Sequence, residues 1–524
     1  MLRACVLSGT LEIPLVSASI SPCLPRAKTL HSQHKTPIQT FFFLSISMES
    51  EPNPKPTTQL RRSTRLNSKR VPTITPPSQP VPKNKTQNRD IEDCFSQDQA
   101  DRVRSSLLKW YDVNQRELPW RKKHGCGCSG DEDGDAKERR AYEVWVSEVM
   151  LQQTRVATVV AYYNRWMQRW PTVHCLAKAS QEEVNEMWSG LGYYRRARFL
   201  LEGAKSIAKE ERFPRSAMEL RGIRGIGNYT AGAIASIAFN EAVPVVDGNV
   251  VRVISRLKAI SSNPKDSSTV KHIWDLAGQL VDKSRPGDLN QALMELGATI
   301  CMPTNPSCTN CPVSDQCRAL SLSRCETSTI KVTDFPPKVI KSKQRLEFAA
   351  VCVVVVQNDS CENQKHATDF YLLVKRPEEG LLAGLWEFPS VLVAERRTDL
   401  ESRRKEMDNY LENLKLDFGE EYNLVSREDV GEYLHIFSHI RLRMHVELMI
   451  LTSKGGLGQL ENQGKNCQVA WKFVHDSTME SMGLTSGIRK VYNMTQEFRS
   501  KQMLTNAQEP KSKLKRMRSS SIKC

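Results

Sequence analysis

The stretch Leu220–Ala233, LRGIRGIGNYTAGA, places glycines between apolar residues directly before a helical pattern. Gly225 and Gly227 permit a tight turn, because a residue without a Cβ adopts backbone conformations that others rarely reach. Free amides at the start of the following helix can hold a phosphate oxygen. Taken alone, such a turn is usually a connector between helices, so it indicates a pair of helices and only weakly a phosphate site.

The residues around this turn indicate a helical domain. Apolar residues recur with a helical period from about residue 98 to 320, and no stretch alternates as a half-buried strand would. Within this part, Ala141–Trp170 is predicted to form one long helix. The insertion at 124–137, rich in Gly, Cys and Asp, is predicted to be an exposed loop.

The hydrophobic period changes beyond residue 346. Strands are predicted at Phe348–Val356 and Phe370–Val374, a bent strand pair at Tyr433–Leu448, and helices near Asp399–Leu414 and Ser486–Phe498. We therefore expect a multidomain protein in which an α+β domain follows an all-α domain. The predicted boundaries are 96–320 for the helical domain, 321–344 for a connector and 345–498 for the α+β domain.

The two ends, 1–95 and 499–524, lack the apolar pattern of a packed domain. No acidic residue lies between Ile13 and Met48, as in an organellar transit peptide. The basic run Arg61–Arg70 indicates a nuclear address or, equally well, a solvated basic tail. We expect the nucleus, with a mitochondrion or chloroplast as the destination of the presequence.

The charge of the chain favours a polyanionic partner. Its 524 residues include 75 Lys and Arg against 59 Asp and Glu, a net charge of +16. Nucleic acid is the first choice of partner and an acidic membrane surface the second. The longest apolar run, Phe348–Val356, is too short to cross a bilayer, which excludes a membrane-spanning protein.

Four cysteines follow one another closely at the end of the helical region, with the spacing C-x6-C-x2-C-x5-C: Cys301, Cys308, Cys311 and Cys317. Prolines between them favour turns, so the four thiolates can converge on one centre. Sites of four cysteines hold either zinc or an iron–sulfur cluster. Spacing alone leaves both open, with unligated thiols as a third reading.

Glu148 lies in the predicted helix with apolar neighbours, Val144 and Trp145, on the same face. Burial on that face would raise its pKa and keep it protonated at neutral pH, as a proton donor requires. The alternative is an ordinary surface glutamate that pairs with Arg155 or Lys137.

Asp247 ends the apolar run Val243–Val246 and precedes a helical pattern at Gly248–Arg252. It is a good helix N-cap, which is the default interpretation. A carboxylate at this place can also face positive charge that develops on a sugar. Neither acid decides the function by itself.

Several stretches in one order closely resemble the MutY adenine DNA glycosylases: Leu118–Arg121, Trp145–Val156, Gly190–Tyr194 and Asp247–Val250. The glycine turn resembles the helix–hairpin–helix motif of the wider endonuclease III superfamily, and the cysteine spacing resembles its iron–sulfur loop. The resemblance covers residues from about 105 to 320. It implies a helix–hairpin–helix glycosylase domain with a [4Fe-4S] cluster on the four cysteines.

The resemblance also implies roles for the site residues. Glu148 would protonate nitrogen 7 of adenine, and Asp247 would stabilise the cationic sugar, with Tyr229 and Asn249 holding Asp247 and the departing sugar. Members that also cut the backbone carry lysine at the position of Tyr229, and a phenol forms no Schiff base. The resemblance therefore implies a monofunctional enzyme.

Further residues match positions that contact DNA. Gln291 and Trp120 match the adenine pocket, and Gln153 and Tyr193 match residues wedged into the duplex. For Tyr193 the alternative is core packing. The full set of matched DNA contacts in the helical domain is Trp120, Arg121, Gln153, Thr154, Leu191, Tyr193, Gly225, Gly227 and Gln291.

Residues from about 345 to 498 resemble the Nudix-like domain that ends MutY proteins. A working Nudix hydrolase needs a glutamate where this chain has Trp386 or Ser390, so we expect no hydrolysis there. In the family this domain recognises 8-oxoguanine through a loop that matches Phe437, Ser438 and His439. A lone histidine at a strand bend is otherwise most often structural.

The sequence thus predicts a monomeric adenine DNA glycosylase that removes adenine opposite 8-oxoguanine or guanine in double-stranded DNA. Two alternatives are a bifunctional glycosylase/AP lyase for oxidised pyrimidines and a non-enzymatic DNA-scanning or redox-sensing iron–sulfur protein. A second metal site at Cys126, Cys128 or Cys325 is a further, weaker hypothesis.

Overall fold

The computed structural model describes residues 94–121, 134–339, 343–358, 369–414, 422–453 and 469–508. The predictions on the presequence, the basic runs at both ends, Cys126 and Cys128 lie outside these ranges. Within them, no helix is long and apolar enough to cross a membrane. The larger helices up to residue 339 are α1 (Gln97–Asn114), α2 (Gly134–Leu151), α3 (Val156–Arg169), α4 (Val173–Ala177), α5 (Gln181–Met187), α6 (Arg195–Glu210), α7 (Ala217–Leu220), α8 (Asn228–Phe239), α9 (Gly248–Leu257), α10 (Ser267–Leu280), α11 (Pro286–Thr299) and α12 (Arg318–Ser323).

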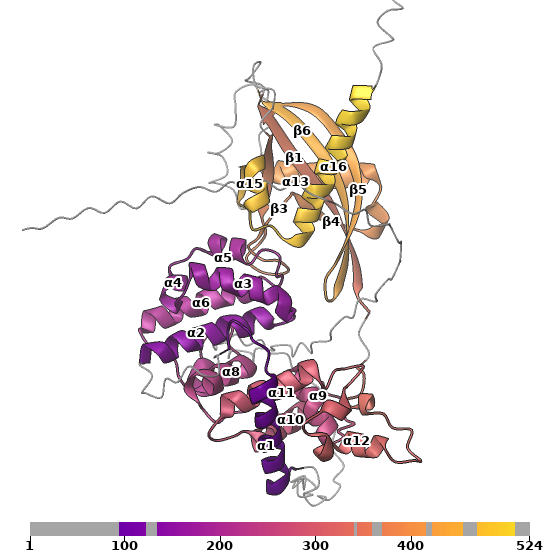
Figure 1. Ribbon diagram of the computed structural model, residues 1–524. Helices are drawn as coiled ribbons and strands as arrows, with labels where there is room; N and C mark the ends of the chain where they lie inside the picture. The colour runs from indigo at the N-terminus through magenta and orange to yellow at the C-terminus, as the bar shows by residue number, and fades with distance from the viewer. Residues whose placement is uncertain are drawn as a thin grey trace, which may run out of the picture. The chain divides into compact units, whose positions relative to one another are not determined.

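The helical part, most of whose helices are labelled in Figure 1, buries two hydrophobic clusters. Apart from Leu385, the first comprises side chains between Trp120 and Ala235, most of them from helices α2 to α8. The second combines Ala100–Tyr111 of α1 with side chains from Val246 to Val313, so the first helix packs against α10 and α11. The described residues up to 339 contain no strand, which confirms the all-α prediction.

The predicted long helix over Ala141–Trp170 is wrong in one respect. Helix α2 ends at Leu151 and α3 begins at Val156, with Gln153 between them in a left-handed conformation, φ 54°. At this break the guanidinium of Arg196, from helix α6, donates to the carbonyls of Val149 and Met150 in the last turn of α2. Helix α2 also begins at Gly134, so the end of the predicted loop is helical.

The C-terminal part is built on one mixed sheet in the order β3-β2-β1-β6-β5, with β4 paired to β1 and β7 to β2. Strands β1 and β6 run parallel along 14 residues each, and β5 and β6 form the predicted bent pair. The elements are β1 (Arg345–Asn358), β2 (Asp369–Lys375), β3 (Trp386–Glu387), β4 (Ser390–Val393), α13 (Leu400–Asn413), β5 (Tyr422–Ile436), β6 (Ile440–Ser453), β7 (Trp471–His475), α15 (Asp476–Ser481) and α16 (Ser486–Gln508).

Alternate residues of β1 face different helices, because successive side chains of a strand point to opposite faces. Cys352 and Val354 belong to the cluster that includes Met407 of α13. Val353 instead belongs to the cluster that includes Val491 of α16. Helix α16 continues to Gln508, beyond the domain end predicted at residue 498, so the start of the predicted tail is helical.

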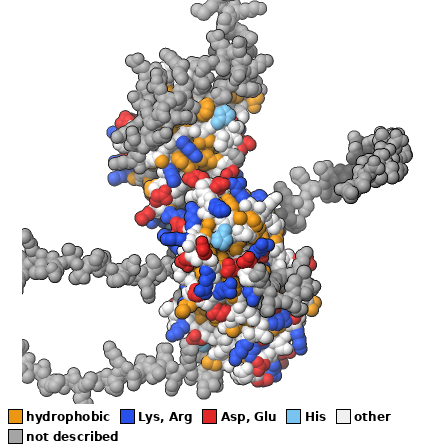
Figure 2. All heavy atoms as spheres, turned by 90° about the vertical axis from the view of Figure 1, so that its left-hand side faces the viewer, with side chains coloured by type: hydrophobic (Ala, Val, Ile, Leu, Met, Phe, Trp, Pro, Cys, Tyr) orange, Lys and Arg blue, Asp and Glu red, His pale blue; other side chains and the backbone are white. Residues whose placement is uncertain are grey.

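The surface of the described residues is of mixed charge. In the face that Figure 2 shows, Lys and Arg side chains are interspersed with Asp and Glu side chains rather than gathered alone. The net positive charge of the chain therefore forms no field of a single sign on this face.

Candidate active site

Glu148 is buried in helix α2, with 6% of its surface exposed. Its Oε2 accepts a hydrogen bond from the hydroxyl of Tyr229. Burial raises the pKa of Glu148 to about 7, and the nearby charge of Asp247 adds to this rise. The hydrogen bond from Tyr229 and the charge of Arg121 act in the opposite direction. The partner is thus Tyr229 rather than Arg155 or Lys137, and the predicted buried acid is confirmed.

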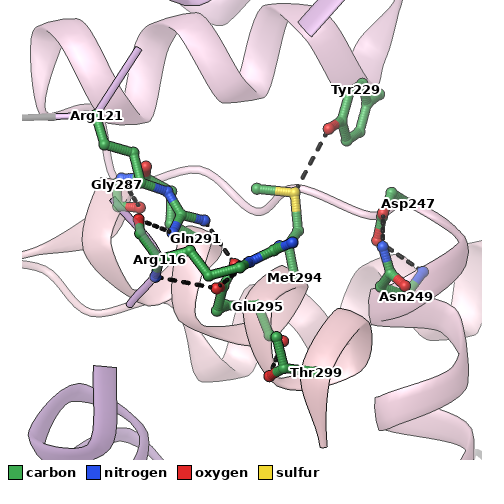
Figure 3. Close-up of polar contacts among 10 residues, drawn as sticks. All are labelled: Arg116, Arg121, Tyr229, Asp247, Asn249, Gly287, Gln291, Met294, Glu295 and Thr299. Carbon is green, nitrogen blue, oxygen red and sulfur yellow. Dashed lines mark hydrogen bonds and ion pairs between the residues drawn. The ribbon is translucent and has the colours of Figure 1, made fainter. Parts of the chain in front are cut away.

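Tyr229 lies in the first turn of α8, directly after the glycine turn. Its hydroxyl donates to Glu148. The same hydroxyl lies 3.4 Å from the Sδ of Met294 (Figure 3). The hydrogen bond thus goes to the carboxyl on α2, which packs against α8, and the expected role of Tyr229 in holding Asp247 and the departing sugar stays a prediction. Burial raises the pKa of Tyr229 well above its usual value, so the phenol stays protonated and remains a donor.

Asp247 is the N-cap of α9, as predicted. Its Oδ1 accepts from the amides of Asn249 (2.9 Å) and Val250 (2.8 Å), and its Oδ2 accepts from the Nδ2 of Asn249 (2.7 Å). Burial raises the pKa of Asp247, while these donors and Arg252 act in the opposite direction. The capping and the catalytic interpretations are therefore compatible, because the cap fixes the carboxylate in one orientation.

Asn249 is held in turn from two sides. Its Oδ1 accepts a 2.8 Å hydrogen bond from Arg252, whose guanidinium also donates to the carbonyls of Gly297 (2.7 Å) and Cys301 (2.8 Å). A Cβ at Gly297 would lie 2.5 Å from the Cβ of Asn249, so α11 approaches α9 closely there. Arg252 was not predicted; its spacing of three residues from Asn249 on a helix is the signal that could have found it.

The structure brings the two carboxyl groups together from different helices. The charge of Asp247 raises the pKa of Glu148, and both raise the pKa of Tyr229, so the three groups lie within electrostatic reach. Asp247 accepts three hydrogen bonds and Glu148 one, which favours the charged form of Asp247. The pair therefore suits one protonated acid and one carboxylate, the division of roles that glycosidic bond cleavage uses.

Behind these acids, α11 presents Gln291 and Glu295 one turn apart (Figure 3). Glu295 is 1% exposed and binds Arg116 (Nε–Oε1 2.6 Å) and Arg121 (Nη2–Oε2 2.7 Å). Although burial raises the pKa of Glu295, these hydrogen bonds more than offset it and leave the pKa lowered. The amide of Gln291 donates to the carbonyl of Gly287 (3.2 Å). Sequence reasoning missed Glu295, which shares a helix face with Gln291 at a spacing of four.

Trp120 is buried and packs edge-on against Tyr163, with ring centroids 5.3 Å apart. The carbonyl of Trp120 accepts a 2.7 Å hydrogen bond from Arg140. Trp120 is thus fixed in the first hydrophobic cluster, next to Arg121 in sequence. Its expected contact with adenine stays a prediction.

The two residues expected to enter the duplex are both exposed. Gln153 is exposed, and Tyr193 is 48% exposed, which excludes core packing for Tyr193. Leu191, also expected at the DNA, is 7% exposed and its side chain belongs to the first hydrophobic cluster, so its expected contact with DNA stays a prediction. Gly190 (φ 94°) and Gly192 (φ 73°) turn the chain so that Leu191 points inward and Tyr193 outward.

The glycine turn connects α7 to α8 as a helical hairpin. Gly225 has φ +88°, and a Cβ there would lie 2.5 Å from the Cβ of Phe199, so only glycine fits. Gly227 is the N-cap of α8 and carries no side chain to cap the first amides. Those amides suit a phosphate oxygen, as the sequence predicts. Thr154, the other polar residue matched to DNA, is half-buried, and its hydroxyl donates to the carbonyl of Gln152 (3.3 Å).

The four cysteines lie in the loop that follows α11. None of Cys301, Cys308, Cys311 and Cys317 forms a disulfide. Burial raises the pKa of the Cys311 thiol to about 12, and the other three thiols are close enough to add to it. Arg256, itself buried, donates to the Sγ of Cys301 (3.2 Å).

Taken as they stand in the structure, the described side chains of His, Cys, Asp and Glu form no group of three or more arranged around a metal ion. The donor chemistry of the cysteine loop nevertheless suits an iron–sulfur cluster, because four free thiols share one loop. Cys325 lies apart as an exposed residue.

In the C-terminal part, the turn between β5 and β6 carries Phe437, Ser438 and His439. The amide of Phe437 donates to the carbonyl of Ile440 (2.8 Å), and the side chains of Ser438 and His439 are exposed. The turn is thus the end of a hairpin that exposes two polar side chains, one of which, Ser438, shares a 2.7 Å hydrogen bond with the hydroxyl of Tyr193.

Two acids of helix α13, in the domain that resembles a Nudix hydrolase, are paired with arginines. Asp408 binds Arg427 (2.7 Å) and Glu406 binds Arg397 (2.7 Å). Nothing in these contacts favours hydrolysis, whose predicted absence stays a prediction.

Two family models match the chain: HhH-GPD superfamily base excision DNA repair protein over residues 146–279, and NUDIX domain over residues 364–494. The first covers Glu148, Tyr229 and Asp247, and the second covers the β5–β6 turn. Their order along the chain agrees with the helical part followed by the sheet.

Curated relatives named adenine DNA glycosylase cover both parts. The Arabidopsis thaliana protein is 53% identical over 77% of this chain and 65% of its own length. The Rattus norvegicus protein is 44% identical over 66% of this chain and 70% of its own length. The Schizosaccharomyces pombe protein is 38% identical over 80% of this chain and 95% of its own length. With identities of this size over most of several relatives, and with both domains in the same order, the chain belongs to the adenine DNA glycosylase family.

Proposed function

We propose that this protein hydrolyses the N-glycosidic bond of adenine that lies opposite 8-oxoguanine or guanine in double-stranded DNA. The observation that carries the proposal is a buried Glu148, with a pKa raised to about 7, within electrostatic reach of Asp247. Two carboxyl groups with different proton affinities are the machinery that glycosidic cleavage requires. The family to which the chain belongs supports the choice of adenine as the base.

In the proposed reaction the adenine leaves the stack and enters the site, where Glu148 donates its proton to nitrogen 7 of the purine. Protonation makes adenine a better leaving group, and the electrons of the glycosidic bond go to the base. The sugar becomes cationic, and Asp247, held ionised by the amides of Asn249 and Val250, stabilises that charge. Water then adds to the sugar and loses a proton.

The reaction is proposed to stop at base release. Tyr229, which stands where lyases of the superfamily have lysine, hydrogen-bonds Glu148 and cannot form a Schiff base. We therefore expect no strand cleavage without added alkali. Cleavage in neutral buffer would favour the bifunctional alternative instead.

The test is single-turnover base release on duplexes with adenine opposite 8-oxoguanine, guanine or thymine. Glu148→Gln keeps the shape but cannot donate a proton, so the rate should fall about 100- to 10,000-fold while mispair binding persists. Glu143→Gln is the matched control, because Glu143 lies on the same helix but pairs with Arg140 away from the acids. Near-normal turnover by Glu148→Gln would exclude the proton-donor role.

We also propose that Cys301, Cys308, Cys311 and Cys317, whose four free thiols share one loop, hold a [4Fe-4S] cluster. Purified protein should carry about four irons per chain with broad visible absorption. Cys317→Ser should lower the iron content. One zinc per chain would exclude the cluster.

The exposed residues Ser438 and His439 are proposed to contact 8-oxoguanine in the opposite strand, consistent with their place at the end of the β5–β6 hairpin. A monomer that acts on nuclear DNA remains the proposed form and location. The presequence makes a mitochondrion or chloroplast the second site. Microscopy of the tagged full chain, with and without residues 1–47, tests the location.

A further inference from the structure

Arg196 lies in the first turn of α6 and binds two separate turns of the chain. Its Nη1 donates to the carbonyls of Val149 (2.8 Å), Met150 (3.1 Å) and Gln152 at the end of α2. Its Nη2 donates to the carbonyl of Gly192 (3.1 Å) and, at 3.4 Å, to that of Leu191. One guanidinium therefore joins the segment before Gln153 to the segment before Tyr193.

This half-buried cation has no carboxylate partner among the described residues, and its partial burial lowers the pKa of Arg196 to about 10. Its charge is balanced by carbonyl oxygens at the C-terminal end of α2, where the helix dipole is negative. The faces of Trp188 and Tyr193 lie 5.2 Å and 5.5 Å from its Cζ and add a cation–π contribution. Removing a cation from water costs free energy. Here the hydrogen bonds to five carbonyl oxygens, which a neutral side chain without these donors could not form, offset that cost.

The two turns share a conformational peculiarity. Gln153 (φ 54°) and Tyr193 (φ 50°) are both non-glycine residues in the left-handed region, and both are exposed. Such a conformation persists only where the surroundings hold it. Two of the carbonyls that Arg196 binds, those of Gln152 and Gly192, directly precede Gln153 and Tyr193, so the guanidinium holds a peptide group next to each left-handed residue.

We propose that Arg196 is a positioning residue that locks both turns at once and so presents Gln153 and Tyr193 to the duplex as one unit. This inference rests on the proposed function, because the inference assigns Gln153 and Tyr193 to the step in which adenine leaves the stack. Arg196 itself touches neither substrate nor reacting atoms. Lysine keeps the charge but is a single point donor, so it cannot span the two sets of carbonyls.

The test compares Arg196→Lys with the matched control Arg198→Lys, an arginine on the same helix that pairs with Glu202 (2.9 Å). Base extrusion is followed with a fluorescent purine analogue in place of the adenine, and base release is measured separately. Arg196→Lys should slow both steps about tenfold, as loss of preorganisation does, and leave the pH at which base release declines unchanged. Arg198→Lys should behave as the wild type.

Tyr193→Ala, made alone and combined with Arg196→Lys, shows whether Arg196 acts through Tyr193. Tyr193→Ala should slow base extrusion in the wild-type background and change it little in the Arg196→Lys background, because the effects of residues that act as a unit are not additive. The same fold loss in both backgrounds would overturn the inference, as would normal extrusion by Arg196→Lys.

Gly192→Ala covers the case in which Arg196→Lys does not fold. A Cβ at Gly192 meets nothing within 4 Å, so alanine strains only the left-handed turn (φ +73°) and should likewise slow extrusion without moving the pH limit. Normal extrusion by this variant would also overturn the inference. If the wild-type protein releases no adenine, the proposed function itself is wrong. That result is distinct from the variant results, which test only the role of Arg196.

Discussion

Replacing Tyr229 with phenylalanine removes the hydroxyl that donates to Glu148 and keeps the ring that packs beside it. That hydrogen bond favours the ionised form of Glu148 and so holds its pKa below the value that burial alone would give. The variant should therefore have a Glu148 with a pKa above about 7.

The size of the shift follows from the strength of the bond. A hydrogen bond to a charged group contributes about 1.5–3 kcal/mol, and one pKa unit corresponds to about 1.4 kcal/mol. The pKa should rise by about one to two units. Since only the protonated acid can donate, base release declines as the pH rises through this pKa, and the decline should move to higher pH in Tyr229→Phe.

The assay is single-turnover base release across the pH range, quenched and then cleaved in alkali at one fixed pH. Tyr111→Phe is the control, because the buried hydroxyl of Tyr111 has no hydrogen-bond partner among the described residues. The readout is the pH at which base release declines, and a variant that is slower at every pH does not change that value. If the decline of Tyr229→Phe coincides with that of the wild type, Glu148 is not the group whose ionisation limits the reaction.

Three further changes test other parts of the structure. Glu295→Gln leaves Arg116 and Arg121 without their buried carboxylate and should lower the free energy of unfolding by about 3–5 kcal/mol in urea denaturation, whereas an unchanged midpoint would contradict the role of this network. Gly297→Ala places a methyl group against Asn249 and should cost about 1–3 kcal/mol by the same measurement, together with slower base release; an alanine that is neutral in both would show that the α9–α11 approach does not matter. The double change Ser438→Ala and His439→Ala should reduce the ratio of rates for 8-oxoguanine over guanine as the opposite base, and equal discrimination by wild type and variant would remove this turn from recognition.

The sequence was sufficient for the elements that depend on local pattern. The strands at Phe348–Val356 and Phe370–Val374 and the N-cap at Asp247 were predicted from periodicity and residue type, and the structure confirms them. The buried state of Glu148 was one of two open alternatives, because its apolar neighbours do not show what covers them. The packing of α8 on α2 decides it.

Features that depend on long-range contacts were not predicted. The break between Leu151 and Val156 falls inside a continuous helical pattern, and Arg196, which binds the carbonyls there, is 44 residues away from Gln152. The hydrogen bond from Tyr229 to Glu148 joins residues 81 apart, and the ion pairs of Glu295 join residues 179 and 174 apart. No local pattern encodes such distances, so the hydrogen bond between Tyr229 and Glu148 could not be predicted from the sequence.

The division of the helical part into two clusters has a consequence for how the molecule is made. Apart from Leu385, the first cluster comes from one continuous stretch of sequence, so helices α2 to α8 can bury most of it as soon as they leave the ribosome. Helix α1 is synthesised first but must wait for α10, whose Gln279 accepts from the amide of Phe95 across 184 residues. A nascent chain that stops after α8 therefore carries Glu148 in a packed half before Asp247 has been made, so such a fragment would fold with only one of the two acids.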